Sequence, residues 1–291
     1  MKVPNNGNLT AIVTGASSGI GVRYAIELAG EGNNLILVSN QAEEVKNVAL
    51  KISKDYNLQY RELTEQSDCV EKGFDCPEGS SSKWVSALYK DLARPESAYE
   101  LFELCMSRKI EVDILINNAG IFFFRDVMEC SPEKVSTILT LHIYTVSMLC
   151  RLFGAEMAKR KRGYILNMSS LSAHMTFPGI SLYAATKSYI RTMSIAMRLE
   201  LKEYNVNVLT VSPGAVATDL YSLPKNLQRL GIRLGIIYRP ERLARKAMKK
   251  LYAGKKEFVP GSINRLFKPL CKILPQPFIL WARKKTAKFR K

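Results

Sequence analysis

The chain is poor in metal-binding residues and in long hydrophobic segments. It contains only two histidines, and none of its six cysteines forms a Cys-x-x-Cys pair, so we expect no metal site. Reduced thiols in such a chain are typical of a cytoplasmic protein. The first ten residues, MKVPNNGNLT, lack the hydrophobic region of a signal peptide. The apolar uncharged run 135–150 is too short to span a bilayer and predicts a buried helix.

Acidic residues are scarce near the C-terminus. The 291 residues include 43 Lys and Arg against 26 Asp and Glu, which gives a net charge of +17. Residues 225–291 hold 20 basic side chains and two acidic ones, whereas residues 1–224 are close to neutral. Such asymmetry favours contact with an anionic membrane or another polyanion, and a solvated basic surface is the alternative.

Short apolar runs alternate with amphipathic stretches along the chain. We expect strands over 9–15, 34–40, 83–92 with its end at Asp91, 110–120, 162–170 and 206–214. Helices are expected over 22–29, 43–54, 132–158 and 183–204. This alternation predicts an α/β fold, a single Rossmann-type, doubly wound parallel sheet with helices on both faces. Residues 61–82 are polar and predict an inserted surface loop, with a redox pair of Cys69 and Cys76 as the alternative.

A glycine-rich turn, Thr14-Gly15-Ala16-Ser17-Ser18-Gly19-Ile20-Gly21, joins the first expected strand to the first helix. Gly15 permits a tight turn, Gly19 lets the backbone approach a pyrophosphate, and Gly21 allows the helix to pack close to the sheet. The helix N-terminus then offers free N–H groups and the positive end of its dipole to an anion. The placement predicts a dinucleotide site, and an ordinary loop is the alternative.

Further motifs accompany this turn. They are Asn117-Asn118-Ala119-Gly120 after the fourth strand, Tyr183-Ala-Ala-Thr-Lys187 on a helix, Ser170 thirteen residues before the tyrosine, and Pro213-Gly214 after the sixth strand. Order and spacing match one family over roughly residues 8–220. By these motifs the chain resembles the short-chain dehydrogenases/reductases, and among them the hydroxysteroid and 3-ketoacyl-type reductases.

Tyr183 and Lys187 lie four residues apart on the expected helix and therefore share one of its faces. A nearby ammonium favours the phenolate and lowers a tyrosine pKa from its usual value of about 10, so the pair is suited to general acid–base catalysis. A chance helical pair is the alternative. The resemblance implies that Tyr183 donates the proton in a reduction, that Lys187 also holds the nicotinamide ribose, and that Ser170 positions the carbonyl.

The resemblance also implies a set of cofactor-binding residues, with Asp91 near the adenine. They are Thr14, Gly15, Ser17, Ser18, Gly19, Ile20, Gly21, Ser39, Asn40, Asp91, Leu92, Asn118, Ala119, Gly120, Tyr183, Lys187, Pro213, Gly214, Val216 and Thr218. An acid at the end of the second strand would bind the ribose 2′-hydroxyl and repel a 2′-phosphate. The residues there, Ser39-Asn40-Gln41, include no acid, which favours NADP(H) and leaves NAD(H) open. Arg23 would assist only if it faces the turn.

One position departs from the family pattern. The family usually carries an asparagine in the middle of the long helix, where it completes a tetrad with the Ser, Tyr and Lys, and His142 stands there in this chain. We expect His142 to join the catalytic set as part of a proton relay through water. A hydrogen-bonded core histidine is the alternative.

The C-terminal part, 225–291, is expected to form a substrate lid and a basic helical extension, while residues 1–224 form the catalytic domain. The apolar and basic segment after Thr218 favours a hydrophobic ketone, such as a steroid-like molecule or an acyl chain. From about residue 262, apolar residues at helical spacing with basic flanks favour an interfacial membrane helix, and packing on the domain is the alternative.

The leading hypothesis is therefore an NAD(P)(H)-dependent oxidoreductase that reduces a hydrophobic ketone. A cofactor-binding protein with weak catalysis, acting as a sensor or scaffold, is the second hypothesis, and the departure at His142 permits it. Nucleic-acid binding is not expected, because no recognised module accompanies the basic tail and aromatic interleaving is sparse. A homo-oligomer and a peripheral membrane location are both compatible with the sequence.

Overall fold

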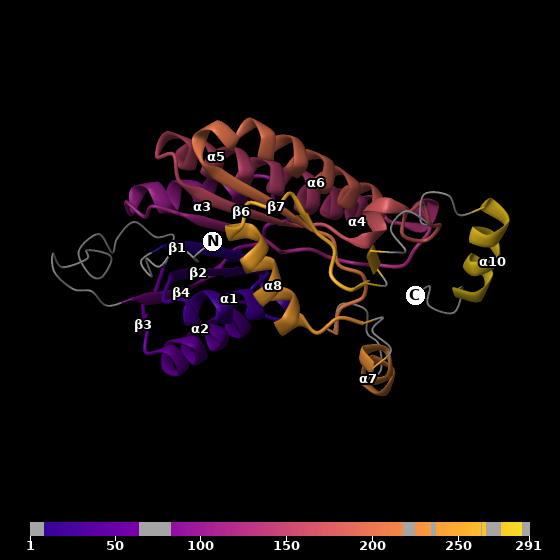
Figure 1. Ribbon diagram of the computed structural model, residues 1–291, viewed down its shortest axis with the longest axis horizontal. Coiled ribbons are helices and arrows are strands. Elements are labelled where there is room, and N and C mark those ends of the chain that lie inside the picture. The colour runs from indigo at the N-terminus through magenta and orange to yellow at the C-terminus, as the bar shows by residue number, and fades with distance from the viewer. Residues whose placement is uncertain are drawn as a thin grey trace.

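A parallel sheet forms the middle layer of the computed structural model, and helices cover both of its faces (Figure 1). The structure describes residues 9–63, 83–217, 225–233, 237–262, 264–265 and 275–286. One face of the sheet carries α1 (Gly19–Gly30), α2 (Ala42–Tyr56) and α8 (Pro240–Tyr252). The other face carries α3 (Ser97–Ser107), α5 (Thr145–Lys159) and α6 (Ser181–Glu200). This is the doubly wound architecture that the sequence predicts.

Within the described residues, eight strands form the sheet in the order β3-β4-β2-β1-β5-β6-β7-β8, and all neighbours are parallel. Their bounds are β1 Thr10–Thr14, β2 Asn34–Ser39, β3 Gln59–Tyr60, β4 Trp84–Tyr89, β5 Ile114–Asn117, β6 Gly163–Met168, β7 Val206–Val211 and β8 Glu257–Phe258. The strand order reverses between β1 and β5. In open α/β sheets, ligands bind at such a point, beyond the carboxyl ends of the strands.

The other helical elements are shorter. They are η2 (Val127–Glu129), α4 (Pro132–Leu139), η3 (Thr140–Tyr144), η4 (Leu171–His174), η5 (Lys202–Tyr204), α7 (Lys225–Arg233) and α10 (Gln276–Thr286). One turn of π-helix, η3, joins α4 to α5 without a break. By length and composition alone, the run Pro132–Lys159 is the one described helix that qualifies to cross a membrane. One of its faces packs on the sheet and on α3, where Phe153 meets Phe102 edge to face.

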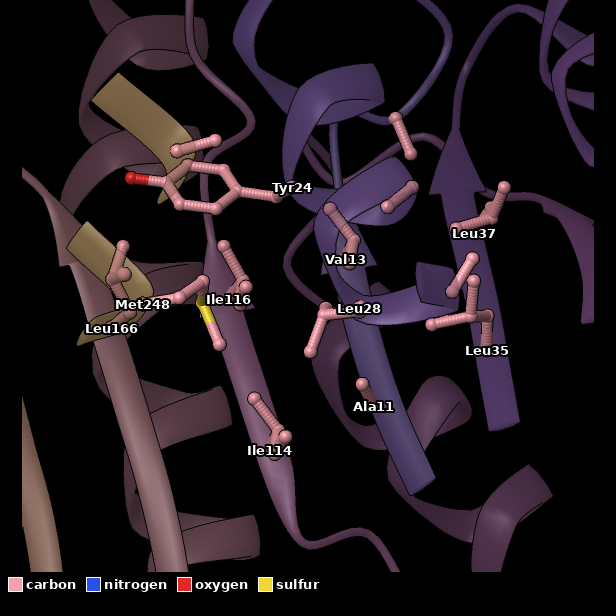
Figure 2. Packing of buried hydrophobic residues seen from close by; sticks show 14 of the residues in the cluster. Ala11, Val13, Tyr24, Leu28, Leu35, Leu37, Ile114, Ile116, Leu166 and Met248 are labelled. Carbon is pink, nitrogen blue, oxygen red and sulfur yellow. The ribbon is translucent and has the colours of Figure 1, made fainter. Parts of the chain in front are cut away.

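Apolar side chains along each strand alternate between the two helical layers. In β1, Ala11 and Val13 join the cluster with α1, whereas Ile12 joins the cluster on the opposite face. Figure 2 shows Tyr24 of α1 and Met248 of α8 packed above the first face. Each fully buried aliphatic side chain contributes on the order of 1.5–3 kcal/mol. A shift by one residue would move each side chain into the opposite helical layer, so the packing of the two cores fixes the register of the strands.

Helix α8 belongs to this core although it lies in the strongly basic part of the chain. Its apolar face packs on α1, and its exposed side includes Arg245, which pairs with Glu27 of α1 at 3.3 Å. The buried residues of α8 are Pro240, Leu243, Ala244, Ala247, Met248 and Leu251. Part of the basic excess is therefore the outer face of a packed helix.

Several elements differ from the sequence-based expectations. Strand β4 ends at Tyr89, two residues before Asp91, because the Asp91 carboxylate accepts a hydrogen bond from Ala93 N (3.0 Å) and begins a turn. The sequence interpretation assigns no element to α3, and it misses the two-residue edge strands β3 and β8. The expected insertion falls, from residue 64 to residue 82, outside the described residues, and so do both of its cysteines.

Candidate active site

The glycine-rich turn has a backbone that requires its glycines. Gly15 and Gly19 have φ values of +66° and +58°, a region that other L-residues rarely adopt. A Cβ on Gly21 would lie 2.1 Å from the carbonyl oxygen of Gly15, so α1 can approach the turn only with glycine there. The first turn of α1 contains no acidic residue, which leaves its N–H groups and its dipole available to an anion.

Thr14 and Asn118 join this turn to the loop after β5. The Thr14 hydroxyl donates to Ile116 O (3.2 Å) and accepts from the backbone N–H groups of Asn118 (2.9 Å) and Ala119 (3.0 Å). The side-chain amide of Asn118 donates in turn to the carbonyl oxygens of Thr14 (3.0 Å) and Gly15 (3.2 Å). The two motifs therefore form one hydrogen-bonded unit where the strand order reverses.

Polar side chains at the end of β2 form a second cluster. Ser39 Oγ donates to Ser17 Oγ (2.9 Å), Ser17 Oγ donates to Gln41 Oε1 (2.7 Å), and Gln41 N donates to Ser39 Oγ (3.2 Å). All of these side chains are uncharged. Arg23 faces away from the turn, because its guanidinium pairs with Glu241 of α8 at 3.0 Å.

These groups line a cavity of about 600 Å³ at the carboxyl ends of the strands, a size typical of ligand pockets. Of the residues named from the sequence, it is lined by Gly15, Ser17, Ser18, Gly19, Ile20, Ser39, Asn40, Asp91, Leu92, Asn118, Ala119, Gly120, Ser170, Tyr183, Lys187, Pro213, Gly214 and Val216. Thr14 and Gly21 lie behind this lining, where they hold its shape. Thr218 falls outside the described residues.

Three of the predicted catalytic residues face this cavity together. Tyr183 and Lys187 are buried on α6, with Lys187 Nζ 5.6 Å from the centre of the Tyr183 ring. Lys187 Nζ donates to Met168 O at 3.0 Å. Ser170 follows β6, and its Oγ accepts from Ser172 N at 3.2 Å. Because that bond uses a lone pair, the Ser170 hydroxyl hydrogen remains for a ligand.

The charge of Lys187 is set by its surroundings. Burial lowers the pKa of Lys187 to about 7, because the ammonium loses its hydration. A lysine that titrates near neutral pH is typical of functional sites, where protons must move in both directions. Its charged form favours a phenolate at the neighbouring Tyr183.

A buried ionic cluster around Glu257 lies next to the loop 213–216 at the cavity. Glu257 of β8 accepts a hydrogen bond from Arg191 Nε of α6 at 2.8 Å, and Ser212 Oγ donates to the same carboxylate at 3.2 Å. His174 Nε2 lies 3.3 Å from Glu257 Oε1. Since Ser212 directly precedes Pro213, this cluster fixes the loop that forms one wall of the cavity.

His142 lies next to the cavity but does not line it. The side chain is fully buried in η3, and its ring centroid lies 5.9 Å from that of Tyr183. Both ring nitrogens have partners: Ile121 N donates to Nε2 (3.1 Å), and Nδ1 lies 2.9 Å from Thr186 Oγ1. A relay through water at His142 stays a prediction.

Sequence reasoning misses an aromatic run, Phe122-Phe123-Phe124, that follows the loop after β5. Phe122 contacts Tyr183 edge to face, with ring centroids 5.0 Å apart. The ring centroids of Phe124 and Phe177 lie 6.3 Å apart. A Cβ on Gly179 would lie 2.8 Å from the Phe124 ring. Three consecutive aromatic residues beside a binding motif are a signal in the sequence, because pockets for apolar ligands are lined by such side chains.

Comparison with known proteins places this site in context. The family model described as short chain dehydrogenase matches residues 9–72 and 76–226. The very-long-chain 3-oxoacyl-CoA reductase of Anas platyrhynchos is 27% identical over 220 residues, which cover 74% of this chain and 62% of that protein. The 17-beta-hydroxysteroid dehydrogenase type 3 of Mus musculus is 29% identical over 213 residues, which cover 72% of this chain and 61% of that protein. The matched part thus spans about three fifths of the length of these relatives.

Solved structures share the fold. The short-chain dehydrogenase from Sphingobium yanoikuyae in complex with NADPH has a TM-score of 0.71 at 23% sequence identity, with 92% of this chain and 97% of that chain covered. The family model matches well over half of the residues, and the matched range contains the glycine-rich turn and the Tyr183–Lys187 pair. The chain therefore belongs to the short-chain dehydrogenase/reductase family.

Proposed function

We propose that the protein is an NAD(P)(H)-dependent oxidoreductase that interconverts the carbonyl and alcohol forms of a hydrophobic substrate, in particular by reducing a ketone. The observation that carries the proposal is the convergence of Ser170, Tyr183 and Lys187 on the cavity that begins at the glycine-rich turn. The relatives named above include a 3-oxoacyl-CoA reductase and a hydroxysteroid dehydrogenase. Both names support carbonyl–alcohol chemistry on an apolar molecule.

The residues along the cavity fit a nicotinamide dinucleotide. The turn 15–20 and the N-terminus of α1 would hold the pyrophosphate. Asp91 and Leu92 would border the adenosine, while the loops 118–120 and 213–216 would border the nicotinamide. Bound there, the cofactor supplies or accepts the hydride.

The remaining chemistry belongs to the side chains of this protein. In a reduction, Tyr183 gives its hydroxyl proton to the substrate oxygen, and Ser170 donates a hydrogen bond to the same atom. The Lys187 ammonium stabilises the resulting phenolate and is close enough to the cavity to bind the ribose hydroxyls. Phe122 packs against the Tyr183 ring and limits its orientation.

NADP(H) is the proposed form of the cofactor, with NAD(H) as the alternative. No carboxylate belongs to the described cluster at the end of β2, so a 2′-phosphate meets no like charge there. The hydroxyl and amide groups of Ser17, Ser39 and Gln41 offer hydrogen bonds to it. Because Arg23 is paired with Glu241, the preference would come from hydrogen bonds and the absence of repulsion.

The substrate class follows from the aromatic run 122–124. The Phe122 ring contacts the Tyr183 ring, and the Phe124 and Phe177 rings form a second aromatic pair in the same part of the chain. Aromatic side chains beside the proposed proton donor favour a steroid-like or acyl-chain ketone over a sugar. The segment 218–224, expected to close over the substrate, lies outside the described residues.

A cytoplasmic location with peripheral attachment to a membrane is also proposed. Val127 and Met128 of η2 and Leu280 and Trp281 of α10 are exposed apolar residues, which we call the mouth-side patch. An ion pair between Arg283 and Asp126 holds α10 beside η2. Apolar anchors with basic neighbours suit the surface of an anionic bilayer, and a hydrophobic substrate would reach the nearby aromatic run from there.

Other hypotheses remain open beside this proposal. In this proposal, residues 1–224 carry the chemistry, and residues 225–291 provide the lid and the membrane contact. Helix α8 and strand β8 of the second part also belong to the core of the fold. A homo-oligomer is compatible with the fold. A cofactor-binding sensor with weak catalysis would need only the binding half of the site.

The oxidation of NADPH in the presence of hydrophobic ketones tests the proposal. The unmodified protein should consume NADPH with a 3-oxoacyl-CoA or a ketosteroid. Tyr183→Phe should lower turnover by roughly 10²–10⁴-fold and leave NADPH binding largely intact, since only the proton donor is removed. Equal turnover by the variant would overturn the catalytic assignment, and tight cofactor binding without any turnover would favour the sensor hypothesis.

A further inference from the structure

The two ring nitrogens of His142 connect two separate parts of the site. On one side, Nε2 accepts a hydrogen bond from the backbone N–H of Ile121. Ile121 belongs to the loop 118–121 after β5, which we call the cofactor loop. On the other side, Nδ1 lies 2.9 Å from the hydroxyl of Thr186, one residue before Lys187 on α6. The ring packs so closely that a Cβ on Gly120 would lie 2.9 Å from Nε2.

The partners determine which nitrogen carries the hydrogen. A backbone N–H can only donate, so Nε2 of His142 must present its lone pair to Ile121 and the hydrogen must reside on Nδ1. The Thr186 hydroxyl then accepts from Nδ1 and donates its own hydrogen to the carbonyl oxygen of Tyr183 at 2.9 Å. The chain of hydrogen bonds runs in one direction, from the cofactor loop through the imidazole to the turn that carries Tyr183.

Protonation of this ring is strongly disfavoured. A second hydrogen on Nε2 would face the Ile121 N–H and remove its acceptor. Burial, and after it the charge of Lys187, hold the pKa of His142 well below its usual value. Among the described residues, the titratable groups that act on the ring are Tyr183 and Lys187, both on α6, and neither is a carboxylate that would offset this effect.

We propose that His142 is a positioning residue, a neutral imidazole that clamps the cofactor loop to the turn of α6 carrying Tyr183 and transfers no proton. The inference rests on the proposed function only for the roles of the groups that the clamp positions, namely the loop that would bind the cofactor and the proposed proton donor Tyr183. It explains why the ring lies in a π-turn, where the bulged helix directs His142 at two partners from different elements. It also assigns the departure from the family's asparagine a definite role.

The tautomer of His142 in the unmodified protein is the first test. Since the chain has only two histidines, a long-range ¹H–¹⁵N spectrum resolves both, and His142→Gln identifies the signal of His142. We expect the neutral form with its hydrogen on Nδ1 and no titration between pH 5 and 8. This form is the minor one for a free imidazole, so its observation is specific. Titration in this range, or a hydrogen on Nε2, would overturn the clamp.

A matched pair of variants is the second test. The amide of His142→Gln reaches the position of Nε2, where its oxygen can accept from Ile121, whereas His142→Asn reaches only the position of Nδ1. We expect the Kd for NADPH to rise about tenfold in the Asn variant, because a buried N–H loses its acceptor, and to stay within about threefold in the Gln variant. The pH profile of turnover from pH 5 to 8 should keep its shape in the Gln variant, because the clamp predicts that His142 does not titrate in this range.

The outcomes separate the clamp from the proposed function. Equal NADPH affinity in the two folded variants, or loss of a pH inflection in His142→Gln, would contradict the clamp even if the protein reduces ketones. The expected tautomer and affinities, together with no turnover of any ketone by the unmodified protein, would support the clamp and contradict the proposed function. Thermal melts show whether each variant is folded before its affinity is compared.

Discussion

Lys187 holds an ammonium group in a buried site, where it donates to a backbone carbonyl oxygen. Burial lowers the pKa of Lys187 to about 7, whereas an unfolded lysine has a pKa of about 10.4. The unfolded chain therefore binds more protons between these two values, and the free energy of unfolding rises with pH across that range. The destabilisation by Lys187 is complete below about pH 7 and disappears above the pKa of the unfolded state.

Lys187→Met should therefore stabilise the fold while abolishing the proposed catalysis. At pH 7 we expect the free energy of unfolding to increase by on the order of 3–5 kcal/mol, and this gain should shrink by about 1.4 kcal/mol per pH unit as the pH rises. Urea unfolding at pH 7, 8 and 9 measures it. Lys159→Met, which removes an exposed lysine, is the control. A gain in the free energy of unfolding that does not change with pH would mean that burial does not lower the pKa of Lys187.

At the scale of elements, we expect the β1–α1 turn and the end of β2 to determine whether NADP(H) or NAD(H) binds more tightly. The cluster of Ser17, Ser39 and Gln41 is uncharged, and Asn40 lies exposed at the edge of the cavity. We therefore expect the discrimination between NADP(H) and NAD(H) to depend on the absence of a carboxylate from this short segment.

NADPH should bind more tightly than NADH, and Asn40→Asp should reverse that order. A carboxylate about 4 Å from a phosphate adds repulsion on the order of 1–4 kcal/mol in the dielectric range of a protein surface, and it can accept a hydrogen bond from the ribose 2′-hydroxyl. Fluorescence titration of both cofactors measures the change, with Asn40→Ser as the neutral control. Tighter binding of NADH by the unmodified protein would refute the NADP(H) proposal without affecting the fold.

The sequence predicts the elements whose signal is local. Continuous apolar runs mark the central strands, and the glycines at 15, 19 and 21 mark the turn that their backbone angles and contacts require. The spacing of Tyr183 and Lys187 likewise predicts a shared face of α6. Strands β3 and β8 contain two residues each, too few for a periodic pattern, and they form because a neighbouring strand offers free backbone groups.

Contacts between distant segments account for most of what the sequence does not predict. The partners of His142 are a backbone N–H 21 residues away and a hydroxyl 44 residues away, and only the folded chain brings them together. The same holds for Arg23, whose orientation depends on α8. Residue type alone suggests a hydrogen-bonded core histidine at 142, but it does not identify the groups to which the ring bonds.

At the scale of the molecule, charge and exposed apolar surface are unevenly distributed. The outer face of α8 accounts for part of the basic excess. Beyond α8, the mouth-side patch exposes 95% of Met128 and 56% of Trp281, and Figure 1 shows α10 standing apart from the sheet at the end where α4 begins. This arrangement places the exposed apolar residues of η2 and α10 close to the basic side chain of Arg283, which pairs with Asp126.

The mouth-side patch should bind anionic vesicles. Each Lys or Arg near an anionic surface contributes on the order of 1 kcal/mol, and the attraction falls off within a Debye length. We expect co-sedimentation with phosphatidylserine-containing vesicles that weakens as salt rises, and about tenfold weaker binding for the double variant Met128→Ser, Trp281→Ser. Leu199→Ser, at the far end of α6 and 65% exposed, is the control. Unmodified protein that stays in the supernatant at low salt would refute the membrane proposal.

The central claim concerns the transfer of a hydride between a nicotinamide and a carbonyl carbon. The most direct measurement uses NADPH with deuterium at both C4 positions of the nicotinamide, a hydrophobic ketone, and mass spectrometry of the alcohol that forms. We expect one deuterium on the carbinol carbon with the unmodified protein and a roughly 10²–10⁴-fold lower yield rate with Tyr183→Phe. Absence of labelled alcohol across 3-oxoacyl-CoA and ketosteroid substrates, from a protein that binds NADPH, would contradict the claim.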